Sequence, residues 1–224
     1  FALALSTQGY VVVSGLAEGI DGAAHEGALG AAAGGAGTVA VVGTGLDRVF
    51  PPRHRELAHR IAAQGALVSE FAPGTPALPE HFPQRNRIIA GLSLGTLVVE
   101  AALRSGSLIT ARLATEAGRE VFAIPGSIHA PQSKGCHALL KQGAKLVETA
   151  HDILEELRGV QAARPLAEPE PAPADALLHR LHLIADAEQV LYVVTDLVGD
   201  DVGLCEIARG PEAALELVVE AQVD

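Results

Sequence analysis

The stretch YVVVSGLAEGIDGAAHEGAL, residues 10–29, reads as a strand followed directly by a helix. Residues 11–13 are all valine, and such a continuous apolar run is typical of a strand that is buried on both faces of a sheet. Two small residues, Ser14 and Gly15, come next, and the remainder has helical spacing. A strand joined at once to a helix predicts a parallel sheet of the α/β class.

The same alternation continues along the chain. Further strands are predicted at residues 38–43, 66–70, 94–100, 120–126 and 144–148, and helices at residues 18–34, 53–64, 84–90, 107–117, 133–142 and 150–159. This pattern predicts a Rossmann-like parallel sheet covered by helices, formed by residues 1–159, with Gly159 ending the last helix. The chain opens on what reads as the end of a helix, so we expect the first strand of such a fold to be missing.

The remaining residues have a different composition. Residues 160–175 are rich in Pro, Ala and Glu, which predicts an extended linker. The fold of the C-terminal segment, residues 176–224, is left open, although residues 176–185 and 210–223 could be helices and residues 189–198 could be a strand.

The net charge of −11 argues against a generally basic nucleic-acid-binding protein. However, residues 158–224 carry 13 acidic and four basic residues, whereas residues 85–134 carry six basic and three acidic residues. The negative charge therefore lies mainly in the C-terminal part, and the middle of the chain is locally positive. Cys136 and Cys205 form no C-x-x-C pair, so neither a zinc site nor a disulfide framework is predicted. We expect a cytoplasmic protein that requires no cofactor and has no membrane-spanning segment.

Small residues follow four of the predicted strands. They are Ser14 and Gly15, Gly43 to Gly45, Ser105, Gly106 and Ser107, and Gly126 and Ser127. In a parallel sheet these turns share one edge, and the free N–H groups of the helices that follow suit a phosphate. Any tight turn between a strand and a helix needs such residues, but four of them at one edge favour a ligand that carries phosphate.

The stretch FPQRNRIIAGL, residues 82–92, places Arg85 and Arg87 near the start of a predicted helix. Two arginines at this end oppose the helix dipole, so we expect them to face solvent and an anion. An asparagine between them, Asn86, could bond a base edge or a sugar. The alternative is that both arginines are solvated or form ion pairs with Glu80 and Glu70.

Asp21 and His25 are four residues apart on one face of a predicted helix. Such a pair could serve acid–base chemistry or bind a metal. We prefer the alternative in which Asp21 stabilises the helix N-terminus and His25 packs beside it, because no third ligand has matching spacing.

Six blocks of residues occur in an order that resembles the DNA processing protein A family, also called Smf or DprA. They are SGLAEGIDGAAHEGAL, GTGLDRVFPPRHREL, GALVSEFAPGTPALPEHFPQRNRIIAGLS, VVEAALRSGSLITARLA, GREVFAIPGS and PQSKGCHALLKQGAKLV, within residues 8–157. The resemblance implies a Rossmann-fold protein that binds single-stranded DNA, protects it during natural transformation and helps to load the RecA recombinase. It also implies a homodimer and no catalytic activity.

By this resemblance, the DNA-binding pocket maps onto Arg85, Asn86, Arg87, Ser105, Gly106, Ser107 and Lys134. The small residues at the other strand ends, Ser14, Gly15, Gly126 and Ser127, complete the predicted site. The chain departs from the family in two places, because no Gly-Ser-Arg turn is present and Glu18 stands where Arg or Lys is common. Both departures remove positive charge, so we expect weakened DNA binding.

An enzyme is the competing hypothesis, namely a nucleotide phosphoribohydrolase of the lysine-decarboxylase-like Rossmann group. Such an enzyme uses a glutamate in the loop that corresponds to SGSLITARLA, which contains no carboxylate before Glu116. The sequence therefore favours a binding protein.

An apolar stripe in the helix predicted at residues 150–159 consists of Ile153, Leu154 and Leu157. We expect Ile153 or Leu157 at the seam of a homodimer, where Leu157→Glu would yield a folded monomer. The alternative is that the stripe covers its own sheet.

Overall fold

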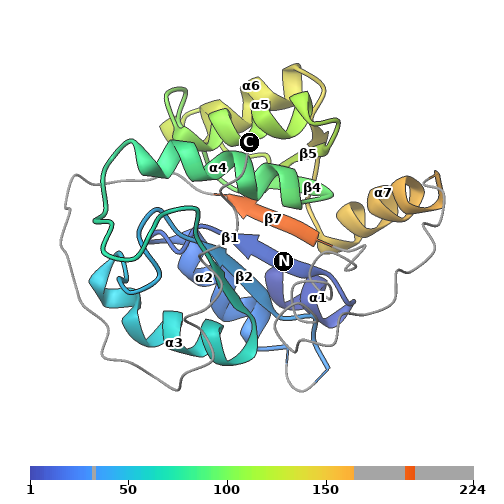
Figure 1. Cartoon of the computed structure of the whole chain (residues 1–224). Helices are drawn as coiled ribbons and strands as arrows, with labels where there is room; N and C mark the ends of the chain where they lie inside the picture. Colours follow the sequence, from blue (N-terminus) through green and yellow to red (C-terminus); the bar gives the residue numbers. More distant parts are fainter. Residues whose placement is uncertain (32–33, 164–189, 195–224) are drawn as a thin grey trace.

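The computed structural model describes residues 1–31, 34–163 and 190–194, and its strands form one parallel sheet in the order β3-β2-β1-β7-β4-β5-β6 (Figure 1). The strands are β1 (Val11–Ser14), β2 (Thr38–Val41), β3 (Ala66–Val68), β4 (Gly95–Val98), β5 (Glu120–Ala123), β6 (Lys145–Leu146) and β7 (Val190–Val194). Every neighbouring pair is parallel, which confirms the predicted fold class.

Helices cover both faces of the sheet, as is visible in Figure 1. They are α1 (Ala2–Thr7), α2 (Ile20–Leu29), α3 (Arg55–Gln64), α4 (His81–Leu92), α5 (Gly106–Glu116), α6 (Lys134–Lys141) and α7 (Ala150–Ala163), with short 3₁₀ turns at Pro52–His54 and Pro131–Ser133.

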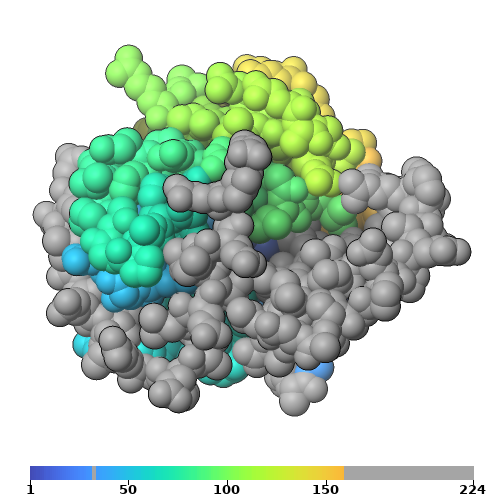
Figure 2. Space-filling view, in the orientation of Figure 1, coloured from blue at the N-terminus to red at the C-terminus, as the bar shows by residue number. Residues whose placement is uncertain are grey.

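Side chains that alternate along the strands divide the core between the two faces. Val12, Leu97 and Phe122 pack with α1, α2 and α7 on one face. Val98, next to Leu97 in β4, points to the other face and packs with α5 and α6. The fold therefore has three layers, and α4 joins α5 and α6 on the second face, where Ile89 packs against β1 and β2. In the space-filling view, α4 and α5 form neighbouring green parts of the surface (Figure 2).

All six strands predicted within residues 1–159 are present at the predicted places. The last helix differs, because α7 continues past Gly159 to Ala163, into the segment predicted to be a linker. Of the C-terminal segment, residues 190–194 are described and form β7, while the helices considered at residues 176–185 and 210–223 lie outside the described residues. Within the described part, no helix is long and apolar enough to cross a membrane.

The strand β7 lies in the middle of the sheet. Tyr192 is opposite Val13 of β1 on one side and opposite Thr96 of β4 on the other. Among the described residues, β7 alone joins β1–β3 to β4–β6 in the sheet. A strand from the C-terminal segment is therefore part of the Rossmann-like domain.

The apolar stripe of α7 packs inside the protomer. Ile153 and Leu157 have no exposed surface, Leu154 is 8% exposed, and all three belong to the core cluster that contains Phe122. The stripe therefore covers its own sheet, and the three side chains offer no surface to a second copy. The expected dimer seam at Ile153 or Leu157 is wrong for this physical reason.

A proline in β7 should disrupt the sheet. Tyr192→Pro removes a backbone donor at a position with a strand on each side, and we expect it to lower the free energy of unfolding by about 3 kcal/mol or more. Lys145→Pro in the edge strand β6 is the control and should cost less. Urea denaturation followed by circular dichroism measures both, and equal losses would contradict the central position of β7.

Replacing Leu157 by glutamate should now affect folding rather than assembly. A carboxylate buried without a partner destabilises a core by several kcal/mol, roughly 3–5 here. We expect Leu157→Glu to lose its cooperative thermal transition, whereas Glu155→Gln on the exposed side of α7 should melt like the parent chain. A folded Leu157→Glu variant would restore the seam hypothesis.

Candidate functional site

The predicted site residues divide into two groups along the carboxyl edge of the sheet. Ser14 and Gly15 follow β1, and the helix that contains Arg85 packs against β1 and β2. The turn at residues 105–107 follows β4, and the segment at residues 126–134 follows β5. Because β7 lies between β1 and β4, the structure does not gather all of these residues at one point.

The turn after β1 already contains an anion. One carboxylate oxygen of Asp21, Oδ2, accepts hydrogen bonds from the backbone N–H groups of Gly15 and Ala17, both at 3.1 Å. These are donors that a phosphate would need in this turn, and Ser14 is completely buried. Asp21 thus occupies the turn after β1, which argues against the prediction that Ser14 and Gly15 bind DNA.

Arg85 is buried, with 2% of its surface exposed. Its Nη1 donates to the carbonyl oxygen of Gly15 at 2.6 Å and to that of Val41, and its Nε donates to Oδ1 of Asn86 at 2.9 Å. Asn86 is itself only 7% exposed. The guanidinium thus links α4 to the ends of β1 and β2, and the prediction that Arg85 and Asn86 face a ligand in solvent is wrong.

The place of Arg85 on α4 explains this difference. The sequence predicted a helix from residue 84, which would place Arg85 in the first turn, but α4 begins at His81. Arg85 then lies one turn before Ile89, on the face that packs against the sheet. Gly15 leaves the space that the guanidinium needs, since a Cβ at this position would lie 2.2 Å from Nη2 of Arg85.

Arg87 is exposed and forms an ion pair with Glu70. This is the alternative that the sequence left open for the arginines of α4. The carboxylate of Glu70 offsets the charge of Arg87, so Arg87 contributes little net positive charge to the edge of the sheet.

The turn after β4 caps α5. Oγ of Ser105 accepts from the backbone N–H of Ser107 at 3.2 Å, and the two hydroxyl groups hydrogen-bond to each other. Gly106, between them, faces open space, because a Cβ there would meet no atom within 4 Å. The turn thus leaves room for a ligand at the N-terminus of α5.

Ala101 holds the loops after β4 and β5 together. Its N–H donates to the carbonyl oxygen of Gln132 at 2.7 Å, and its own carbonyl accepts from the N–H of Gly135 at 2.7 Å. A Cβ at Gly135 would come within 2.6 Å of that carbonyl oxygen. These contacts bring the start of α6, with Lys134, against the loop that leads to Ser105.

The segment after β5 is exposed at Gly126, Ser127 and Lys134. Nε2 of His137 lies 3.0 Å from the carbonyl oxygen of Gly126, and Nζ of Lys134 donates to the carbonyl oxygen of Ile128. The structure therefore brings the predicted residues Gly126, Ser127 and Lys134 to one loop and helix start.

Ion pairs distribute the positive charge unevenly. In the described part of the chain, carboxylates neutralise Arg53, Arg60, Arg87, Arg112 and Lys145. Arg104, Lys134 and Lys141 have no carboxylate within ion-pair distance among the described residues. All three belong to the loop after β4 or to α6, so this part of the molecule carries a local group of uncompensated positive charges, while Arg55 in α3 and Arg158 in α7 are further cations without a carboxylate partner within the described ranges.

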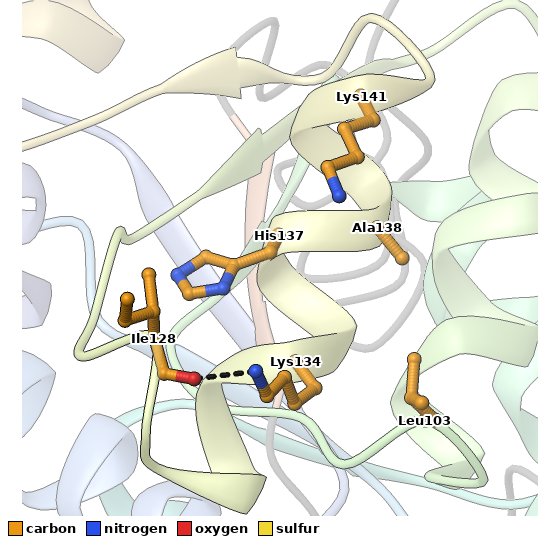
Figure 3. A pocket seen from close by; sticks show the side chains of 6 residues that line it. All are labelled: Leu103, Ile128, Lys134, His137, Ala138 and Lys141. Atoms are coloured by element: carbon orange, nitrogen blue, oxygen red, sulfur yellow. Dashed lines mark hydrogen bonds between the residues drawn. The ribbon is translucent and has the colours of Figure 1, made fainter.

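A pocket of about 470 Å³ runs along this part of α6 (Figure 3). Its lining residues are Leu103, Ile128, Lys134, His137, Ala138 and Lys141. Of these, the sequence had singled out only Lys134 as a site residue. The spacing of Lys134, His137 and Lys141 by three and four residues was the available signal, since such residues share one helix face.

Asp21 and His25 serve separate purposes, as the preferred alternative required. His25 is fully buried, and its Nδ1 lies 2.7 Å from Oγ1 of Thr38. Burial, with smaller contributions from His54 and Arg85, lowers the pKa of His25 to about 3, so the ring is neutral near pH 7. In the described residues, no three His, Cys, Asp or Glu side chains are grouped so that they could hold a metal.

The close approach of Gly15 to Arg85 can be tested by adding one methyl group. Gly15→Ala should lower the free energy of unfolding by roughly 1–3 kcal/mol, because the buried guanidinium cannot move without losing its carbonyl partners. The matched control is Gly106→Ala, where the added methyl meets open space. Replacing a glycine in a helix by alanine should raise the free energy of unfolding by about 0.5–1 kcal/mol. Chemical denaturation of both variants checks this, and a loss of the same size in the control would refute the steric explanation.

Comparison with known proteins places this site in context. Residues 1–158 match the family described as DNA recombination-mediator protein A. Protein Smf of Escherichia coli (strain K12) is 55% identical over 159 residues, which cover 70% of this chain and 42% of that protein. DNA processing protein DprA of Streptococcus pneumoniae (strain ATCC BAA-255 / R6) is 53% identical over 146 residues, covering 65% and 51%. The chain thus spans about half the length of these relatives.

Two solved structures share the fold. The X-ray structure of DNA processing protein A from Streptococcus pneumoniae matches with a TM-score of 0.62 and 50% identity, over 69% of this chain and 55% of that one. The structure of DNA processing protein A from Helicobacter pylori matches with a TM-score of 0.61 and 28% identity, over 71% of each chain. The Helicobacter protein is described as binding single-stranded DNA in a unique mode.

Proposed function

The chain belongs to the DNA recombination-mediator protein A family, and from this premise we propose that it binds single-stranded DNA at the edge formed by β4 and β5. The observation that carries the proposal is the group of cations without carboxylate partners, Arg104, Lys134 and Lys141. Lysine and arginine that neutralise DNA phosphates release counterions, and this release supplies most of the affinity of non-specific binding.

The proposed contacts follow the two turns at this edge. Lys134 and Arg104 neutralise phosphates, and the open space at Gly106 lets the backbone of the strand approach the N-terminus of α5. Gly126 and Ser127 supply exposed backbone beside Lys134. Arg87 joins this surface only when a phosphate displaces Glu70, whereas Arg85 and Asn86 act by holding α4 in place.

Binding should be weak and sensitive to salt. Glu18 forms an ion pair with Arg53 near the turn after β1, so this side of the edge carries little free positive charge. The net charge of −11 adds a general repulsion of DNA. The local positive charges of the β4 and β5 edge oppose that repulsion.

The biological role that we propose is that of a carrier. The protein holds incoming single strands in the cytoplasm during natural transformation and transfers them to the RecA recombinase for recombination. It works by binding, without catalysing a reaction on the DNA. The relatives named Smf and DNA processing protein DprA support this role. It acts as a homodimer whose seam lies outside the buried stripe of α7, and sedimentation measures that state directly.

The competing phosphoribohydrolase has little support in the site. Such an enzyme needs a carboxylate close to the ribosyl bond, and Glu116 lies in the last turn of α5, away from the turn at residues 105–107. Its carboxylate is exposed and pairs with Arg112. None of the contacts of the described residues therefore favours the enzyme.

The salt dependence of binding tests the proposal. Each phosphate contact to single-stranded DNA contributes about 0.7 to the slope of log affinity against log salt, so Lys134→Ala should reduce the slope by about that amount. Lys145→Ala, on the exposed edge strand β6, is the matched control and should leave the slope unchanged. Fluorescence anisotropy with oligo-dT at several salt concentrations measures both.

A duplex of the same length completes this experiment. Single strands flex into a groove more readily than a duplex does, so oligo-dT should bind more tightly at physiological salt. Equal affinity for the duplex and the single strand would contradict the carrier role, and an unchanged slope in Lys134→Ala would exclude Lys134 as a phosphate contact.

A further inference from the structure

The pocket along α6, called the α6 groove below, combines apolar side chains with cations. Leu103 and Ile128 are 65% and 66% exposed, which makes them the two most exposed large apolar side chains among the described residues. They come from different loops, after β4 and after β5. In Figure 3 they flank the start of α6, with Lys134 between them.

The charges of the groove all have one sign. Lys134 lies at the first residue of α6 and Lys141 at its last. Lys141 is seven positions after Lys134, which corresponds to about 10.5 Å along the helix axis. None of the six lining residues is acidic. The groove therefore suits a molecule with negative charge at intervals and apolar surface in between.

Single-stranded DNA has this chemistry. Its backbone repeats a negative charge at every nucleotide, and its unpaired bases expose apolar faces. Enzymes that hold a base outside the stack commonly place it between aromatic or apolar side chains. The chain has only 3% aromatic residues and none among the lining residues, so leucine and isoleucine are the apolar surfaces that this groove offers.

We infer that the α6 groove holds one unstacked nucleobase between Leu103 and Ile128, while Lys141 contacts a backbone phosphate beyond the one at Lys134. The inference rests on the proposed function, since it extends the path of the strand from the start of α6 to its end. His137, whose ring is fixed by the carbonyl oxygen of Gly126, lines the same side of the groove as Ile128 in Figure 3.

The position of Lys134 supports this division of roles. Its Nζ donates to the carbonyl oxygen of Ile128, so the amine lies beside one apolar wall. A phosphate held there would place its attached base next to Ile128. Lys141 forms no hydrogen bond or ion pair with any described residue, so its amine is available for the next contact.

The test separates bases from phosphates by using two probes, oligo-dT and an abasic strand of the same length. In the double variant Leu103→Ser, Ile128→Ser the binding of oligo-dT should fall by about fivefold, the lower end of the loss for a base-contacting side chain. Binding of the abasic strand should not change. Leu146→Ser is the matched control, since Leu146 is also exposed, at 54%, but lies on β6 outside the groove.

The variant Lys141→Gln tests whether Lys141 contacts a backbone phosphate. We expect the salt slope to shrink by about 0.7 with both probes, while Lys145→Gln should leave it unchanged. Circular dichroism verifies that each variant is folded, which the exposure of all the substituted side chains favours.

Two other results would each overturn the inference. If the double variant binds oligo-dT like the parent chain, the groove holds no base. If it loses affinity for oligo-dT and for the abasic strand equally, Leu103 and Ile128 affect contacts with the DNA backbone and not with a base. Failure of the parent chain to bind any strand would instead overturn the proposed function itself, so the two failures are distinguishable.

Discussion

The buried guanidinium of Arg85 constrains much of this structure. A cation inside a protein is costly unless its donors are satisfied, and here the carbonyl oxygens of Gly15 and Val41 and the side chain of Asn86 accept them. This arrangement requires a residue without a side chain at position 15, and it fixes α4 across the ends of β1 and β2. Together with Asp21 in the neighbouring turn, it occupies backbone groups in this half of the carboxyl edge. The binding site that we propose therefore lies in the other half, after β4 and β5.

The positive charges are also distributed unevenly between the two halves of the carboxyl edge. Acidic partners neutralise Arg53, Arg60 and Arg87, whereas Arg104 and the lysines at the two ends of α6 have no carboxylate partner among the described residues. Most of the negative charge of the whole chain belongs to residues 158–224. The net charge is therefore a poor guide to partners, and the local distribution at one edge of the sheet decides what can bind.

The sequence allowed the strands within residues 1–159 to be predicted, because uninterrupted valine-rich runs have few alternative explanations. It failed at Arg85 because a charged residue near a helix start was expected to face solvent, whereas Arg85 lies one turn before Ile89 on the buried face of α4, where carbonyl oxygens accept its donors. The central place of β7 was beyond prediction, since an apolar pattern indicates a strand but not its neighbours. Leu103 and Ile128 were missed because each is a single apolar residue in a loop, without any periodic pattern around it.

The central strand also affects the order of folding. Both neighbours of β7 precede it in the sequence, and Val98, the last residue of β4, is translated more than ninety residues before β7 begins at Val190. Until then, β1 and β4 each expose a row of unpaired backbone groups, which can pair with other chains. Folds that depend on such distant pairings form slowly and are prone to aggregate on the way. A ribosome-bound chain would therefore carry two incomplete half-sheets, and synthesis of the C-terminal segment would set the time at which they join.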